Sequence, residues 1–255
     1  MNSRKRRFVG LISSVPVEGE FLVQSLRLAP KRVLGNLPFY PGRVRGKEIV
    51  LSISGIGKTN AAHATALLVQ TYSPSLIINF GIGGAYPGKG LKVGDIAVAT
   101  KEIYADEGVQ LKDGYHPLEL LGLPLLKVRR KRFFNQFPLD RQLTRAALRS
   151  ARNVADAKPG TFTTVSLCTG TNKRAKELGE RFDAVCENME GAAIAHLCCL
   201  YGIPCVEIRG ISNIVEGRNL SKWDIGLAAE NCQKAVLEFL TSRETEDLLA
   251  GKSGA

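Results

Sequence analysis

Short apolar runs alternate with amphipathic segments along most of the chain. The apolar runs, many of them next to Gly, Pro or charged residues, are typical of buried strands. They predict strands at 7–12, 48–54, 75–82, 94–104, 161–167, 183–190 and 204–212. The amphipathic segments predict helices at 16–28, 58–72, 139–155, 171–182, 191–202 and 222–241. This alternation indicates an α/β fold with three α/β/α layers, in which helices cover both faces of a mostly parallel sheet.

The pattern also predicts a single domain. A chain of 255 residues is long enough to bury a sizeable core, and it contains neither internal repeats nor a linker. Residues 105–135 are rich in Gly, Pro and basic residues and predict an irregular excursion. We expect the domain to span residues 1–243 and residues 244–255 to form a flexible C-terminal tail.

The composition indicates the cellular compartment in which the protein is expected. Hydrophobic residues make up 44% of the chain and charged residues 23%, and no apolar stretch approaches the ~18 residues of a membrane span. The basic start "MNSRKRRF" is followed by too short an apolar run for a signal peptide. The six cysteines show no metal-binding spacing. We therefore expect free thiols in a reducing cytoplasm, no membrane partner and no metal.

A net charge of +11 raises the alternative of a nucleic-acid partner. Much of this charge lies in residues 4–7 and 127–133. These runs have no aromatic residues at stacking positions, and the chain has no helix-turn-helix or RNA-binding motif. We expect a solvated basic surface, and no nucleic-acid partner.

Two Gly-rich stretches invite comparison with phosphate-binding loops. "SGIGKTNAA" (54–62) has Lys followed by Thr but lacks the upstream Gly of a P-loop, and "GIGGAYPGKG" (81–90) is not a GxGxxG fingerprint that opens a helix. Taken alone, each stretch is equally well explained by tight turns and close backbone approach.

Four motifs taken together are more specific. They are "SGIGKTNAAHAT" (54–65), "INFGIGGAY…LKVGDIAVAT" (78–100), "CENMEGAAIAHLC" (186–198) and "IRGISN" (208–213). In this order the chain resembles the nucleoside phosphorylase/nucleosidase superfamily, and "ENMEGAA", "IYADEGV" and "IRGISN" with a following Trp resemble its futalosine hydrolases most. The resemblance implies a mixed, twisted central sheet, a homodimer or higher homo-oligomer, a small nucleoside substrate, and neither cofactor nor metal.

The resemblance also implies which side chains cleave an N-glycosidic bond. Glu20 matches the carboxylate that activates water; Glu18 is the near competitor, with a plain helix-start charge as its other explanation. Glu190 matches the acceptor of the ribose diol, and Met189 the residue packed under the sugar, although Met also fills cores. Gly83 and Gly84, at the end of the strand 75–82, are further substrate-binding candidates.

Asn213 stands where adenine-releasing nucleosidases carry Asp. An amide cannot protonate N7 of a purine, but its NH₂ donates to the N7 and O6 acceptors of a 6-oxopurine, which a carboxylate would repel. Asn213 therefore favours hypoxanthine over adenine as the leaving base, with a turn residue as the plain alternative. We expect the purine to lie near 165–169, including Ser166, with Phe80 as a weaker candidate.

Water is favoured over phosphate as the nucleophile. Asn79 stands where hexameric phosphorylases place an Arg, and a carboxylate near the site repels phosphate. The likeness implies hydrolysis of futalosine to hypoxanthine and dehypoxanthinyl futalosine, in the alternative menaquinone pathway. Methylthioadenosine/S-adenosylhomocysteine nucleosidase, nucleoside phosphorylase and a binding protein without catalysis stay open.

The remaining charged residues receive weaker assignments. Arg218 or the basic stretch 127–132 is expected to meet the 5′ carboxylate of futalosine. Asp106 and Glu107 lie in a loop near the family's site without an assigned role. Arg209, inside a strand, is expected to form a buried pair with an acidic neighbour such as Glu187.

Overall fold

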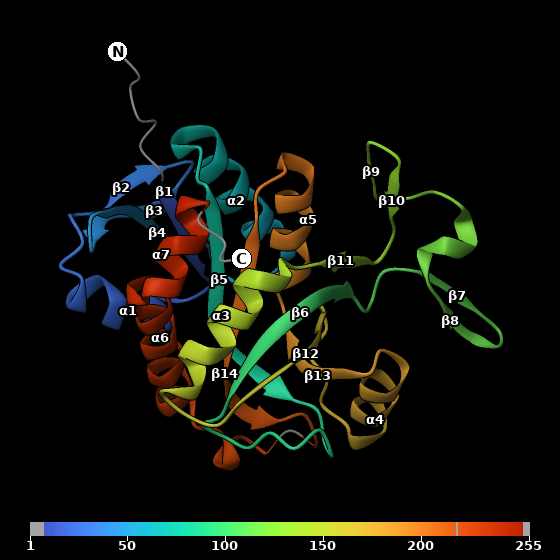
Figure 1. The fold of residues 1–255 in the computed structure, drawn as a ribbon. Coiled ribbons are helices and arrows are strands. Elements are labelled where there is room, and N and C mark those ends of the chain that lie inside the picture. The colour runs from blue at the N-terminus through green and yellow to red at the C-terminus, as the bar shows by residue number, and fades with distance from the viewer. Residues whose placement is uncertain (1–7, 218, 252–255) are drawn as a thin grey trace.

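The computed structural model describes residues 8–217 and 219–251, and it places a ten-stranded sheet between layers of helices (Figure 1). The strands of this sheet are β1 (Phe8–Ser13), β2 (Arg32–Leu34), β3 (Leu37–Val44), β4 (Lys47–Ile53), β5 (Leu76–Ala85), β6 (Ile96–Tyr104), β11 (Gln136–Pro138), β12 (Ala157–Thr164), β13 (Ala184–Asn188) and β14 (Cys205–Ile214). The helices are α1 (Pro16–Ser25), α2 (Lys58–Tyr72), α3 (Arg141–Arg152), α4 (Asn172–Arg181), α5 (Gly191–Tyr201), α6 (Ile225–Thr241) and α7 (Arg243–Ala250).

Helices cover both faces of the sheet, as the apolar pattern predicts. On one face α2 and α5 pack together through small and apolar side chains such as Ala61, Leu68 and Ile194. On the other face α1, α3 and α6 bury a second cluster that includes Leu22, Ala147 and Phe239. The three-layer α/β/α architecture is confirmed.

The sheet is mixed and closes on itself at one end. Strand β1 pairs in parallel with β4 and β5, and β14 pairs in parallel with β5. β12 pairs in parallel with both β6 and β13, whereas β13 runs antiparallel to β5 and β14 antiparallel to β6. These pairings link β5, β13, β12, β6 and β14 into a closed ring. The carboxyl ends of β1, β5, β13 and β14 meet at the rim of that ring, where parallel α/β sheets place their ligands.

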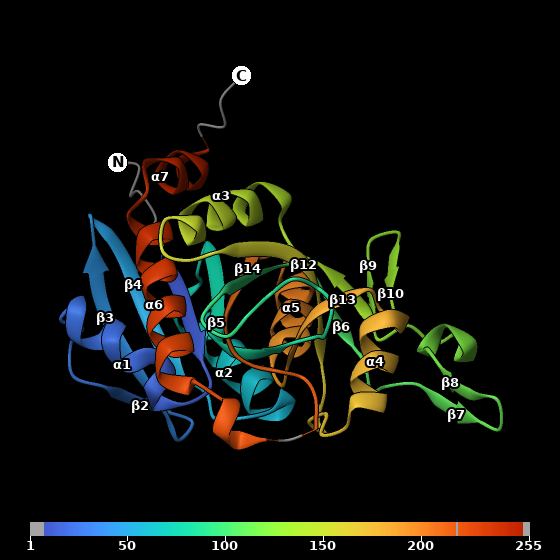
Figure 2. The ribbon, with the colours of Figure 1, turned by 90° about the horizontal axis from the view of Figure 1, so that it is seen from below.

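Three segments differ from the predictions. Residues 105–135 are more regular than an irregular excursion: they form the hairpins β7 (Val109–Leu111) with β8 (Gly114–His116) and β9 (Leu126–Val128) with β10 (Lys131–Phe133), and the 3₁₀ turn η1 (Leu118–Leu121). This excursion projects to one side of the body in both views (Figures 1 and 2). The strands β2 and β3 were not predicted.

The expected flexible tail is wrong as far as Ala250. Helix α7 begins where Ser242 caps it by accepting a hydrogen bond from Thr245 N, and it packs Leu248 and Leu249 against the second apolar cluster. Residues 252–255 of the predicted tail lie outside the described residues. Among the helices that the structure describes, none combines the length and apolar character that crossing a membrane requires.

Candidate active site

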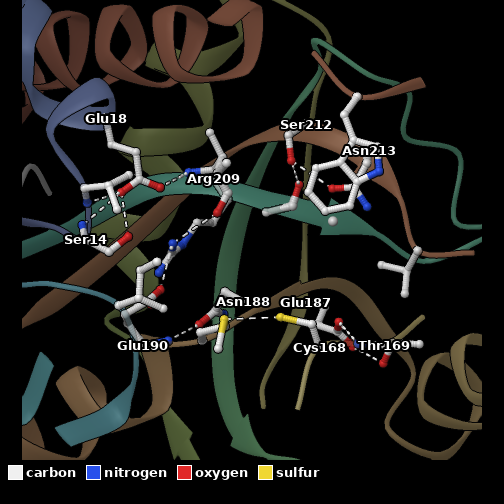
Figure 3. A pocket seen from close by; sticks show the side chains of 18 residues that line it. Ser14, Glu18, Cys168, Thr169, Glu187, Asn188, Glu190, Arg209, Ser212 and Asn213 are labelled. Atoms are coloured by element: carbon white, nitrogen blue, oxygen red, sulfur yellow. Dashed lines mark hydrogen bonds and ion pairs between the residues drawn. The ribbon is translucent and has the colours of Figure 1, made fainter. Parts of the chain in front are cut away.

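A cavity of about 240 Å³ opens at the rim of the strand ring (Figure 3). Its walls come from segments far apart in the sequence: the β1–α1 junction, the end of β5, the loop after β12, the β13–α5 junction and the end of β14. Residues that line it include Ser14, Glu18, Ile56, Gly83, Gly84, Cys168, Thr169, Glu187, Met189, Glu190, Arg209, Ser212, Asn213 and Trp223. The predicted candidates Glu190, Met189, Gly83, Gly84 and Asn213 are thus brought together.

Glu18 supplies a buried carboxylate at one end of this cavity. It lies in the first turn of α1, and its side chain folds back so that Oε2 accepts from Ser14 N at 2.9 Å, Ser14 Oγ at 2.6 Å and Val15 N at 3.1 Å. Oε1 accepts from Ile82 N at 2.8 Å. Only 2% of the residue is exposed. Four donors therefore hold an acceptor against the cavity.

Gly81 makes room for this carboxylate. A Cβ at position 81 would lie 2.5 Å from Glu18 Oε1 and 2.7 Å from its carboxyl carbon, closer than side-chain carbons normally approach. The Gly-rich end of β5 thus serves close packing of a charged group against the strand backbone.

Glu20, the predicted base, does not reach the cavity. It is exposed and lines a separate hollow with Lys31 and Tyr40, on the outer side of α1. Residues two apart on a helix point to different sides, so only one of Glu18 and Glu20 can face the site. The structure places Glu18 there, because as the third helical residue it folds back onto the helix N-terminus.

Glu190 and Arg209 form a second buried charged group, beside Glu18 (Figure 3). Glu190 Oε1 accepts from Gly57 N at 2.9 Å, and Oε2 lies 3.3 Å from Arg209 Nη1. Arg209 also donates from Nη1 to Ile82 O at 3.1 Å and from Nε to Glu207 Oε1 at 2.9 Å. The predicted Glu187 partner of Arg209 is therefore wrong: its acidic partners are Glu207 and Glu190.

Burial governs the charge of this group. Burial raises the pKa of Glu190, although the Arg209 charge and the Gly57 N–H oppose the shift. Burial lowers the pKa of Arg209, but the charges of Glu207, Glu190 and Glu18 outweigh it and the net shift is upward. Arg209 is therefore a permanent cation, and among the described residues its Nη2 is buried without a hydrogen-bond partner.

Asn213 lies at the other end of the cavity from Glu18 (Figure 3). Its Nδ2 donates to Ile214 O at 3.1 Å and its Oδ1 accepts from Ser212 Oγ at 2.9 Å. Because a backbone carbonyl can only accept, the Ile214 contact fixes which side of the amide is nitrogen. One N–H and one oxygen lone pair of Asn213, 9% exposed, are left for a ligand.

Glu187 ties the loop after β12 to the cavity wall. Its carboxylate accepts from Thr169 N at 2.9 Å, Thr169 Oγ1 at 2.6 Å and Tyr86 OH at 2.9 Å. In the same wall Cys168 Sγ lies 3.2 Å from Met189 Sδ, so two sulfurs form a soft, polarisable surface between the two ends of the cavity.

The family model of the phosphorylase superfamily matches residues 9–241, nearly the whole chain. The chain belongs to this superfamily. It is 34% identical over 224 residues to the futalosine hydrolase of Thermus thermophilus, with 84% of this chain and 94% of that protein covered. It is 32% identical over 231 residues to the 5′-methylthioadenosine/S-adenosylhomocysteine nucleosidase of Halalkalibacterium halodurans, with 90% and 95% covered.

A solved structure of a nucleosidase is also similar to this chain. The 5′-methylthioadenosine/S-adenosylhomocysteine nucleosidase of Neisseria meningitidis, in complex with methylthio-immucillin-A, has a TM-score of 0.79 and 30% identity, covering 92% of this chain and 98% of that one. Within the superfamily the chain is therefore a nucleosidase, an enzyme that hydrolyses N-glycosidic bonds. Relatives of both substrate types match at similar identity, so the choice of substrate rests on the chemistry of the cavity.

Two other predicted residues do not line the cavity of the nucleosidase, and a third is not among the described residues. Phe80 is fully buried in the apolar cluster beneath α1 and α6, because alternate residues of β5 point away from the site. Ser166 is exposed and lines a neighbouring pocket, where its backbone N–H donates to Asp106 Oδ2 at 2.5 Å. Arg218 lies outside the described residues.

That neighbouring pocket adjoins the cavity at Ile56 and Met189, which line both. Lys58 stands in it, with Nζ paired to Asp106 at 2.5 Å and to Glu107 at 3.0 Å. Asp106 and Glu107, which the sequence left without a role, thus hold the excursion to the start of α2. The sequence analysis did not single out Lys58. Its position beside the cavity becomes clear from the structure, in which the preceding residue, Gly57, donates to Glu190.

Proposed function

We propose that this nucleosidase hydrolyses a 6-oxopurine nucleoside, with futalosine as the substrate and hypoxanthine as the leaving base. One observation carries the choice of base: an amide, Asn213, stands at the end of the cavity opposite the Glu18 carboxylate. Its one uncommitted N–H suits the N7 or O6 acceptor of a 6-oxopurine. A 6-oxopurine offers this N–H acceptors at both N7 and O6, whereas a 6-aminopurine offers it N7 alone.

The Glu18 end suits the activation of water. Cleavage of the N-glycosidic bond develops positive charge on the sugar, so the reaction needs a nucleophile and a nearby negative charge, as in carboxylate-driven glycoside hydrolysis. Glu18 has two oxygens fixed by four donors, and a water bound there would pass its proton to the carboxylate.

Glu190 suits the ribose. A carboxylate with remaining lone pairs accepts hydrogen bonds from two adjacent hydroxyls, and Glu190 lines the same cavity as Glu18 and Met189. Met189 and Cys168 offer the sugar an apolar, polarisable surface. Glu18 and Glu190 lie at one end of the cavity, where water and ribose would bind, and Asn213 lies at the other, where the base would bind.

The charges of the cavity support hydrolysis over phosphorolysis. Three carboxylates, Glu18, Glu187 and Glu190, line it, and among the described lining residues Arg209 is the one cation. Its charge is already matched by Glu207 and Glu190. A phosphate dianion would therefore enter a site of negative charge, which costs more than admitting water.

The neighbouring pocket gives a 5′ substituent a route out of the cavity. A group attached to C5′ would pass Ile56 and Met189 and reach Lys58, the cation of that pocket. Futalosine carries a carboxylate at this end, which Lys58 would meet after giving up one of its two acidic partners. A methylthio group is uncharged and would not pair with this cation.

The test is base release in phosphate-free buffer. The protein is incubated with futalosine, inosine and methylthioadenosine, and the bases are separated by chromatography. We expect hypoxanthine from futalosine, little from inosine and no adenine from methylthioadenosine. Adenine release would support the methylthioadenosine alternative, and release that begins only after phosphate is added would support a phosphorylase.

A further inference from the structure

Behind Glu190 lies a pair of carboxyl groups that the proposed reaction does not use. Glu102 on β6 and Glu207 on β14 are both buried, at 0% and 1% exposure, and their carboxyl groups lie beside each other. Both crowd the backbone of Gly191: a Cβ there would collide with Glu102 Oε1 and with Glu207 Oε2. Two carboxyl groups in such contact need a proton between them.

The partners of each group say where that proton resides. Glu207 accepts from Arg209 Nε at 2.9 Å, so a cation lies beside it. Besides Glu207, the partners of Glu102 among residues 8–217 and 219–251 are neutral: Thr164 Oγ1 donates to its Oε2 at 2.7 Å and Asn188 Nδ2 to its Oε1 at 2.6 Å. The proton therefore belongs to Glu102, whose O–H donates to Glu207. This agrees with the pKa of Glu102, which is raised by burial first and then by the Glu207 charge.

Glu102 also joins the two supports of Glu190. Through Asn188 it fixes the backbone, because Asn188 Oδ1 accepts from Glu190 N at 2.9 Å and from Gly191 N at 2.7 Å. Through Glu207 it fixes Arg209, whose Nη1 holds the Glu190 side chain. A protonated acid can donate to Glu207 while both of its oxygens still accept, from Thr164 and Asn188; the nitrogen of an amide in its place could not accept.

We propose that Glu102 is a neutral carboxylic acid in the folded enzyme, and that the proton it shares with Glu207 makes it a positioning residue for Glu190. The first claim, that Glu102 is protonated, is the protonation half and needs no substrate. The second claim, that Glu102 positions Glu190, is the positioning half and rests on the role proposed for Glu190. The titratable groups on the surrounding elements are Glu207 and Arg209 on β14, Cys186 on β13, Tyr104 on β6, and Glu190 and His196 on the α5 segment. Burial raises the pKa of Cys186 and Tyr104 and lowers that of His196, so these three are uncharged near pH 7.

The protonation half is tested by the pH dependence of unfolding. A carboxyl group whose pKa is raised on folding binds its proton more tightly in the folded state. The stability that it contributes is fully present below the unfolded pKa, and it is lost progressively as pH rises from that value to the folded pKa. One such proton changes the unfolding equilibrium constant about tenfold per pH unit. We measure this constant by urea titration between pH 5.5 and 7.5 for the wild type and Glu102→Gln.

The ratio of the two constants, wild type over variant, isolates Glu102 from the other titrating groups. We expect the ratio to rise about tenfold per pH unit above pH 5.5, until the folded pKa is reached. A constant ratio overturns the proposal. Glu177→Gln is the matched control: hydrogen bonding to Arg174 lowers the pKa of Glu177, so its ratio should stay constant over this range.

The positioning half is tested by the kinetics of Glu102→Gln on any nucleoside that the wild type cleaves. Loss of one hydrogen bond in the support of Glu190 should raise KM about fivefold, while kcat falls less. The alkaline decline of kcat/KM should also move to higher pH. A KM and a pH profile equal to those of the wild type would overturn the positioning half and leave the Glu102–Glu207 pair a structural role. If the wild type cleaves no nucleoside, that result counts against the proposed function alone.

A spectroscopic measurement covers the case in which Glu102→Gln does not fold. A protonated carboxylic acid has a carbonyl infrared band apart from that of carboxylates. We expect this band at pH 8 in the wild type and also in Glu190→Gln, which removes the other glutamate whose pKa burial raises. Absence of the band in both proteins overturns the proposal.

Discussion

Replacement of Glu18 by Gln separates the carboxylate in the cavity from its neighbour Glu20. The amide can keep its oxygen at the Oε2 position, where Ser14 N, Ser14 Oγ and Val15 N donate. Its NH₂ then faces Ile82 N–H, donor against donor, at a cost of about 1–3 kcal/mol of folding stability. The variant should therefore still fold, but it has no group to accept a proton from water.

The expected loss of rate is much larger than this loss of stability. Removal of a general base lowers kcat by about 10²–10⁴-fold. The matched control Glu20→Gln changes an exposed residue outside the cavity and should stay within about twofold of the wild type. Both variants are assayed by base release at pH 7, with circular dichroism to establish folding. A folded Glu18→Gln with wild-type rate, or a large loss in Glu20→Gln, would refute the assignment of Glu18.

Three further predictions follow from the cavity. Asn213→Asp should lower hypoxanthine release and create adenine release from a 6-aminopurine nucleoside; unimpaired futalosine cleavage with no new activity would contradict the reading of Asn213. Gly81→Ala would push the Glu18 carboxylate aside and should lower kcat about 100-fold, whereas Gly170→Ala, with open space at its Cβ, should not; equal effects would contradict the packing argument. Activity should also fall as acid protonates Glu190, and because burial raises its pKa, this limb of the kcat/KM profile should lie above the ordinary Glu value of about 4.3; an acid limb at or below that value, absent from Glu190→Gln, would contradict it.

The sequence predicts the central strands and helices well because their signals are local. The helix at 58–72 coincides with α2, and the apolar strands are found to within a few residues. Strand β3 was missed because "LPFYPGRV" contains two prolines and a glycine. The structure tolerates Pro41 there, since the short neighbour β2 pairs with β3 only as far as Phe39.

The site was predicted less completely, because pairings in space carry no local signal. The family resemblance predicted Glu190 and Asn213, which both line the cavity, but the choice between Glu18 and Glu20 depends on which side of α1 faces the cavity. A local signal existed: Pro16 at the first helical position makes Glu18 the third, where side chains fold back onto the helix N-terminus. Nothing in the local sequence around Glu102 indicates that β6 and β14 bring it against Glu207.

Base release from futalosine in phosphate-free buffer, with methylthioadenosine alongside, tests the proposed function most directly. Hypoxanthine from futalosine and no adenine from methylthioadenosine is the predicted result. Adenine from methylthioadenosine, with futalosine left intact, would contradict the assignment of Asn213 and of the 6-oxopurine substrate.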